Sequence, residues 1–120
     1  MAHVLPPSRL RTGKRMSAAQ RSKGRRGQQA ARELLTGRDW SVAELNAGTS
    51  AEDFWACELS TGRTYSVEVK NTAAITTTHR KQAMQQAARS KLPWMLLSHI
   101  AGTGSWLVQR QGERPMVWHA

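Results

Sequence analysis

The sequence predicts an α/β (α+β) fold in which a mixed central sheet of about five strands is flanked by helices. Two segments with apolar residues at helical spacing, 17–37 and 76–90, enclose a region where apolar and polar residues alternate. Residues 93–100 (PWMLLSHI) form a near-continuous apolar run, which is typical of a strand covered on both faces. We therefore expect the helices and strands to share one core, without a second domain.

The first helix is expected to begin between Ser17 and Lys23 and to end near Gly37, a residue type that commonly stops helices. Its apolar stripe consists of Ala31, Leu34 and Leu35. A strand is predicted over residues 39–46 (DWSVAELN) because its apolar residues alternate with polar ones. The apolar anchors of this strand are Trp40, Val42 and Leu45.

Two further strands, 52–59 and 64–71, are expected to form a hairpin around residues 60–63 (STGR), which include a glycine suited to a turn. A second helix is then predicted from a threonine cap, at position 76, 77 or 78, to about Ser90. Its buried side is expected to contain Ala83, Met84, Ala87 and Ala88.

The C-terminal part is expected to add the apolar strand Pro93–Ile100 and, after a turn at 102–104 (GTG), short strands at Trp106–Gln109 and Met116–His119. The order is thus a helix, three strands, a helix, and two or three strands.

Charge is the most unusual property of the composition. The 120 residues carry 18 Lys and Arg against 8 Asp and Glu, a net charge of +10. Such an excess indicates a polyanionic partner, with nucleic acid first and an acidic membrane surface second. Cys57 is the only cysteine, which excludes an intramolecular disulfide and disfavours a zinc cluster.

No apolar run reaches the roughly 18 residues that span a bilayer, and the N-terminus lacks the apolar stretch of a secretory signal. We therefore expect a soluble, intracellular chain, and no membrane among its partners. The Arg-, Ala- and Trp-rich usage hints at a high-GC bacterium or its phage. The expected location is the cytoplasm of a bacterial or phage-infected cell.

Residues 1–16 are predicted to form a flexible basic arm, and residues 17–120 a single domain, because Pro6 and Pro7 disfavour a helix in the arm. All charged residues before Glu33 are basic. Such residues bind backbone phosphates with strong, sequence-independent affinity. The alternative is a solubilising tail without a defined contact.

Asp53 and the segment 68–70 (EVK) carry the most informative pattern. In the simplest register, with residues 60 and 63 opposed, Asp53 lies opposite Lys70 and Trp55 opposite Glu68. Opposed residues, and residues two apart on one strand, share a face of the sheet. Asp53, Glu68 and Lys70 are therefore expected to converge on one face. The other face is expected to supply a core layer of Phe54, Ala56, Tyr65, Val67 and Val69.

Two adjacent carboxylates repel each other unless a positive charge lies between them. A hard cation such as Mg²⁺ or Mn²⁺ prefers oxygen ligands and often uses one or two carboxylates together with water and phosphate. In that arrangement Lys70 could orient a water or offset negative charge on a phosphate. The alternative is a surface hairpin with an Asp53–Lys70 ion pair and a solvated Glu68.

These residues resemble the PD-(D/E)XK nuclease superfamily and, more closely, the archaeal-type Holliday junction resolvases with their phage and bacterial relatives. The resemblance covers roughly residues 21–110. It is carried by Lys23-Gly24, residues 32–35 (RELL), the loop 47–49 (AGT), Asp53 and residues 68–70. It implies a restriction-endonuclease-like core.

The resemblance also implies roles for individual residues. Asp53 and Glu68 are expected to be metal ligands, with the Val69 carbonyl as a third, and Lys70 is expected to be catalytic. Thr49 and Ser50 lie in the loop that contacts the DNA backbone in this family. Further DNA contacts are expected from the basic residues at the first helix, namely Lys23, Arg25 and Arg26.

The family carries a glutamate on its first helix, and at the matching position this chain has Gln28. Glu33 is the only acid on that helix, but it lies opposite the apolar stripe, whereas Gln28 lies at the edge of the stripe. We therefore expect Gln28 to approach the metal, with Glu33 as the alternative. A second departure is Glu52, which precedes Asp53 where the family has an apolar residue or proline.

Several other residues invite a functional interpretation. Gln82 could match a glutamine that some superfamily members place on the second helix, although its position favours a solvated side chain. His79, beside Arg80 and Lys81, is expected to contact phosphate or to be exposed. The tryptophans are expected in the core or at a dimer interface, rather than stacked on bases: Trp55, Trp94, Trp106 and Trp118.

The sequence thus favours a Mg²⁺- or Mn²⁺-dependent endonuclease of DNA recombination or repair. The resemblance implies that it is a homodimer that resolves four-way junctions with one nick per subunit and needs no small-molecule cofactor. The alternatives are a nuclease of the same fold that cuts duplex or flap DNA, or a non-catalytic basic nucleic-acid-binding protein. A protein that only binds nucleic acid has no reason to place two acids beside the surface that contacts the phosphates.

Overall fold

The computed structural model describes residues 18–43 and 53–119. In these ranges it contains α2 (Ala18–Thr36), β1 (Trp40–Ala43), β2 (Phe54–Glu58), β3 (Arg63–Lys70), α3 (Thr77–Ser90), β4 (Trp94–His99), β5 (Ser105–Arg110) and β6 (Met116–His119). Each predicted helix and strand is thus present. The predicted arm, 1–16, and the end of the predicted first strand, 44–46, lie outside the described residues.

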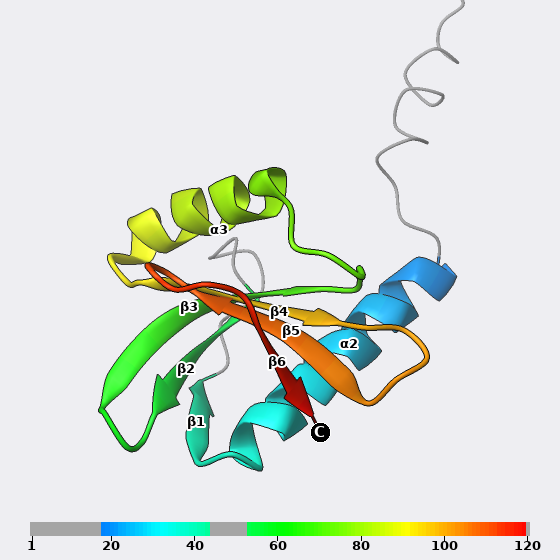
Figure 1. Ribbon diagram of the computed structural model, residues 1–120, viewed down its shortest axis with the longest axis horizontal. Coiled ribbons are helices and arrows are strands. Elements are labelled where there is room, and N and C mark those ends of the chain that lie inside the picture. The colour runs from blue at the N-terminus through cyan, green and yellow to red at the C-terminus, as the bar shows by residue number, and fades with distance from the viewer. Residues whose placement is uncertain (1–17, 44–52, 120) are drawn as a thin grey trace, which may run out of the picture.

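The described strands form one sheet of six strands in chain order, β1 to β6. Neighbouring strands are antiparallel except β3 and β4, which are parallel. Parallel strands need a crossover connection, and α3 provides it. The predicted mixed sheet is confirmed, with one strand more than about five. Figure 1 shows α3 on one face of the sheet and α2 on the other.

The larger core lies between α2 and the sheet. The predicted stripe of Ala31, Leu34 and Leu35 is buried there. It packs against alternate residues of the central strands, namely Phe54, Ala56, Tyr65, Val67, Met95, Leu97, Trp106 and Val108. Burying a side chain as large as Leu or Phe stabilises a fold by about 1.5–3 kcal/mol. This layer therefore holds α2, and with it the residues that α2 presents toward β3.

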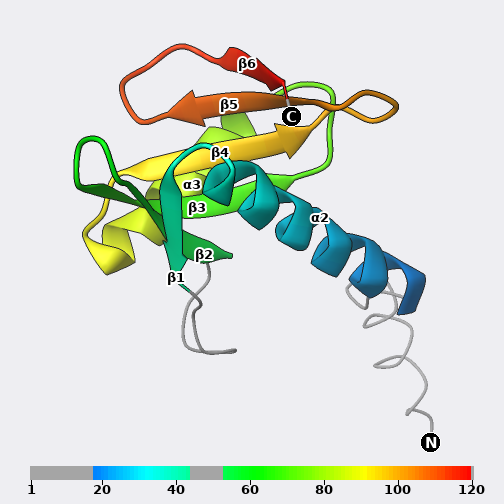
Figure 2. The ribbon, with the colours of Figure 1, turned by 90° about the horizontal axis from the view of Figure 1, so that it is seen from below.

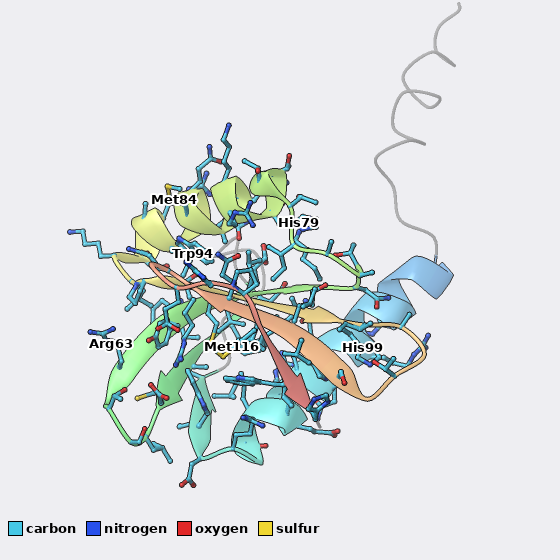
Figure 3. All side chains as sticks on the ribbon, in the orientation of Figure 1. Arg63, His79, Met84, Trp94, His99 and Met116 are labelled. Carbon is cyan, nitrogen blue, oxygen red and sulfur yellow. The ribbon has the colours of Figure 1, made fainter. Side chains whose placement is uncertain are left out.

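The core under α3 is smaller. Ala83 and Ala87, four residues apart, pack on Trp94 and Leu96. The predicted burial of Met84 and Ala88 is wrong, because Met84 is 53% exposed and Ala88 is exposed. Each follows a buried alanine by one residue, or about 100° around the helix, which turns it away from the sheet. Figure 3 shows Met84 on the outward side of α3 and Trp94 beneath the helix.

The beginning of α3 is fixed by a reciprocal cap. Thr76 is the N-cap; its hydroxyl oxygen accepts from the His79 backbone N–H at 3.2 Å, and the His79 ring nitrogen Nδ1 accepts from the Thr76 N–H at 3.2 Å. Burial lowers the pKa of His79, and the charges of Lys70 and Arg80 add to this effect. The neutral ring keeps Nδ1 available as an acceptor. His79 is therefore a half-buried residue that caps a helix, and its expected contact with phosphate stays a prediction.

The register of the β2–β3 hairpin differs from the prediction by two residues. Glu58 lies opposite Arg63 and Phe54 opposite Val67, so the turn consists of residues 59–62. Extending this register puts Asp53 opposite Glu68, and the predicted pairing of Asp53 with Lys70 is wrong. A shift of two residues leaves every side chain on its predicted face. The buried layer predicted for the other face is confirmed.

Candidate functional site

Asp53 immediately precedes β2, at the end of the pairing between β2 and β3. Its backbone N–H donates to the Val67 carbonyl oxygen at 3.0 Å, and its side-chain Oδ2 accepts from the Val69 N–H at 2.7 Å. The Val69 N–H lies beyond the described β2–β3 backbone pairs, and the carboxylate is its hydrogen-bond acceptor there. This contact fixes the acid at the end of the described β2–β3 pairing.

Gln28 reaches Asp53 from α2. Its amide Nε2 donates to Asp53 Oδ1 at 2.8 Å, so each oxygen of this carboxylate accepts a hydrogen bond. Glu33 is exposed and instead accepts a hydrogen bond from Gln29 at 3.2 Å. The structure therefore brings Gln28 to Asp53, and not Glu33, as the position of each residue relative to the apolar stripe indicated.

Glu68 is buried, with 7% of its surface exposed, and it forms a hydrogen bond with Asp53. Burial and the neighbouring charge of Asp53 raise the pKa of Glu68 to about 8, against the opposing charge of Lys70. Burial also raises the pKa of Asp53, although the hydrogen bond from the Val69 N–H acts in the other direction. The two acids favour sharing a proton over carrying two negative charges.

Two glutamines of α3 complete the surroundings of the acids. Lys70 Nζ donates to Gln82 Oε1 at 3.3 Å, and Gln86 forms a hydrogen bond with Glu68. Gln82 is exposed, as expected, but the expectation of a purely solvated side chain is wrong. The contact of Gln86 was missed altogether. The available signal was its spacing: Gln82 and Gln86 each precede a buried alanine of the same helix by one residue.

The donor atoms suit a hard divalent cation. Asp53 and Glu68 provide two adjacent carboxyl groups, and Gln86 Oε1 is a buried oxygen without a hydrogen-bond partner among the described residues. In the described part of the chain, no three His, Cys, Asp or Glu side chains lie close enough together to hold one metal ion. Mg²⁺ is commonly held by one or two carboxylates with water completing its shell, so these residues fit it. The Val69 carbonyl as a third ligand stays a prediction.

A cavity of about 690 Å³ opens beside Lys70. Its lining comes from α2, the ends of β3 and β4, and β5, and consists of Gly24, Arg26, Gly27, Ala30, Val69, Lys70, Asn71, His99 and Trp106. The described lining contains two cationic side chains and no carboxylate, which suits an anionic group. Figure 2 shows the N-terminal half of α2 extending beyond the strands at this place.

The other predicted site residues are placed as follows. Arg25 and Arg26 are exposed on α2. The side chain of Lys23 and all of Thr49 and Ser50 lie outside the described residues. The core position expected for the tryptophans is confirmed for Trp94, Trp106 and Trp118, whereas Trp55 is half-buried. None of the described helices is long and apolar enough to cross a membrane.

No protein-family model matches this chain, and no curated protein does. Among solved structures, the chain is similar to Hjc, a Holliday junction resolvase from the archaeal hyperthermophile Archaeoglobus fulgidus. The TM-score is 0.55 at 14% sequence identity, and the match covers 81% of this chain and 84% of that one. The likeness confirms the predicted fold, a mixed sheet flanked by helices.

Proposed function

We propose that this chain is a metal-dependent endonuclease that cuts branched DNA, with four-way junctions as its substrate. The observation that carries the proposal is the meeting of Asp53, Glu68 and Lys70 at the end of the described β2–β3 pairing, on a fold shared with a Holliday junction resolvase. The net charge of +10 supports a polyanionic substrate.

The chemistry is hydrolysis of a phosphodiester. Asp53 and Glu68, with the Val69 carbonyl, would hold Mg²⁺ or Mn²⁺, which would act as a Lewis acid and lower the pKa of a water. Lys70 offsets the negative charge that develops on the phosphate, and Gln28 keeps Asp53 in position. A new P–O bond forms to the water oxygen, one backbone P–O bond breaks, and the departing oxygen takes up a proton.

The basic surface beside the acids supports DNA as the substrate. Arg26 and Lys70 line the cavity next to the acids, and Arg25 lies exposed on the same helix. Lys23 and the loop residues Thr49 and Ser50 are proposed as further backbone contacts. A protein that only coats DNA gains nothing from two adjacent acids at this place, since a carboxylate repels phosphate.

We further propose a homodimer, because paired symmetric cuts in a junction require two sites related by a two-fold axis. Sedimentation of the full chain at micromolar concentration is expected to give a dimer. A strictly monomeric chain would instead favour a nuclease of the same fold that cuts one strand of duplex or flap DNA.

The test compares cleavage of four-way junction, flap, nicked and linear duplex DNA with Mg²⁺, Mn²⁺ or EDTA. The wild type is expected to cut the junction only with a metal. Asp53→Asn and Lys70→Ala are expected to lose about 100-fold or more in rate while still binding the junction. Arg63→Ala is the matched control, since Arg63 begins β3 (Figure 3), whereas Lys70 ends it.

The outcomes separate the three candidate functions. Full activity of both site variants would show that the cleavage centre lies elsewhere. Cleavage of duplex or flap DNA with an intact junction would favour the nuclease with another substrate. Metal-independent binding of all substrates without any cleavage would leave a non-catalytic binding protein.

A further inference from the structure

Every charged group of the candidate site has its own glutamine partner. Asp53 accepts a hydrogen bond from Gln28 of α2, and Lys70 donates one to Gln82 of α3. Glu68 is hydrogen-bonded to Gln86 of α3. An amide can bind a partner of either charge, because its NH₂ group donates hydrogen bonds and its carbonyl oxygen accepts them. The three contacts orient the charged groups without adding charge to the site.

Gln86 differs from the other two glutamines in one respect. Its amide bonds Glu68, but its oxygen Oε1 is buried and has no hydrogen-bond partner among the described residues. Gln28 and Gln82 carry no such buried unpartnered atom. A buried polar atom without a partner is unfavourable, so a native structure usually supplies one or uses the atom for a ligand.

The location of Oε1 limits what its partner can be. It is bonded to the same carbon as the NH₂ group, so it lies next to the carboxyl group of Glu68. The partner must be a donor, because a carbonyl oxygen only accepts. The nearby ammonium of Lys70 donates to Gln82 and makes no hydrogen bond with Gln86 Oε1. A water held by a cation at Glu68 is a strong donor at this place.

We propose that Gln86 is a positioning residue of the cation site. Its NH₂ group orients Glu68, and its Oε1 accepts a hydrogen bond from a water on the divalent cation that Asp53 and Glu68 hold. This inference rests on the metal site of the proposed function and extends it to a residue of α3.

The chain offers a matched control in the next residue. Gln85 is the same residue type on the same helix, but it is exposed and lies about 100° around the helix axis from Gln86. Substitutions at both positions therefore change helix propensity and net charge equally. Only those at Gln86 change the partners of Glu68 and of the cation.

The experiment measures Mn²⁺ affinity of the full chain without DNA, by calorimetry or by paramagnetic resonance of the free ion. Gln86→Met is expected to weaken binding by about 10–100-fold, the usual effect of losing a group that orients a metal ligand. Gln86→Glu is expected to bind Mn²⁺ at least as tightly as the wild type, since a carboxylate oxygen replaces the acceptor. Gln85→Met and Gln85→Glu are expected to match the wild type.

The opposite effects of the two Gln86 variants distinguish metal positioning from a packing role, which both substitutions would disturb alike. The inference is overturned if Gln86→Met binds Mn²⁺ as tightly as the wild type. It is also overturned if Gln86→Glu binds Mn²⁺ weakly although that variant is folded in EDTA. If Gln86→Met does not fold, the Mn²⁺ affinity of Gln86→Glu compared with that of Gln85→Glu still tests the inference.

The same titrations separate this inference from the proposed function. Asp53→Asn is expected to lose Mn²⁺ binding. If it does while Gln86→Met binds normally, only the role of Gln86 fails. If Gln86→Met weakens binding as expected but the wild type cuts no DNA, only the nuclease proposal fails. A wild type that binds no Mn²⁺ overturns both.

Discussion

Glu68 is the most buried carboxyl group among the described residues. Burial and the charge of Asp53 raise its pKa from the ordinary 4.5 to about 8. In the metal-free protein Glu68 is therefore mostly protonated at neutral pH. Because the folded pKa lies above the unfolded one, this group stabilises the fold fully below about pH 4.5, and the contribution is lost as the pH rises through about 8.

We predict that the free energy of unfolding in EDTA falls as the pH rises from about 5 to about 8. Glu68 contributes at most about 1.4 kcal/mol per pH unit to this slope. Glu68→Gln, which cannot ionise, is expected to flatten the slope, and Glu33→Gln on the exposed side of α2 is expected to keep it. Urea unfolding at a series of pH values measures both. Equal slopes for the wild type and Glu68→Gln would contradict the assignment.

At the scale of the element, α2 contains two glycines that its packing does not require. No atom lies within 4 Å of the position that a Cβ would take at Gly24 or Gly27. Glycine costs a helix about 1 kcal/mol relative to alanine. Both glycines line the cavity beside Lys70, so their missing side chains keep that cavity open.

Two substitutions at Gly27 separate helix stability from access to the cavity. Gly27→Ala and Gly27→Leu are each expected to stabilise the protein by up to about 1 kcal/mol, seen as a higher Tm. The larger side chain is also expected to fill the cavity. Gly27→Leu should therefore bind four-way junctions roughly tenfold more weakly than Gly27→Ala, as fluorescence anisotropy in EDTA would show. Equal affinities of the two variants for the junction would show that DNA does not enter the cavity.

At the scale of the whole molecule, the net charge of +10 is unevenly distributed along the chain. All charged residues before Glu33 are basic, so the N-terminal segment together with most of α2 carries much of the excess. Charge of this kind acts through phosphates and releases counterions, which makes binding dependent on salt and independent of sequence. Under the proposed function, discrimination among DNA structures would depend on contacts other than those with backbone phosphates.

Deletion of residues 1–16 is expected to weaken junction binding and to reduce its salt dependence. Each phosphate that the shortened chain no longer neutralises lowers the slope of log affinity against log salt by about 0.9. The order of preference among junction, flap and duplex is expected to stay the same. Binding titrations from about 50 to 200 mM salt measure both quantities. An unchanged slope would show that the deleted residues do not contact the backbone.

The sequence by itself determined which residues share a face. Alternation placed Asp53, Glu68 and Lys70 on one side of the hairpin, and this held although the register was wrong by two residues, because side chains repeat every two residues along a strand. Helical spacing similarly identified the buried stripe of α2 and the side of that helix on which Gln28 lies.

Only the tertiary structure decided which distant side chains meet. The partners of Lys70 and Glu68 on α3 depend on how that helix is set across the sheet, through Ala83 and Ala87, and periodicity carries no information on that placement. The hydrogen bond from the Val69 N–H to Asp53 likewise depends on how β2 and β3 are placed in the packed sheet. Local pattern fixes the direction of a side chain, whereas its neighbours follow from how whole elements pack.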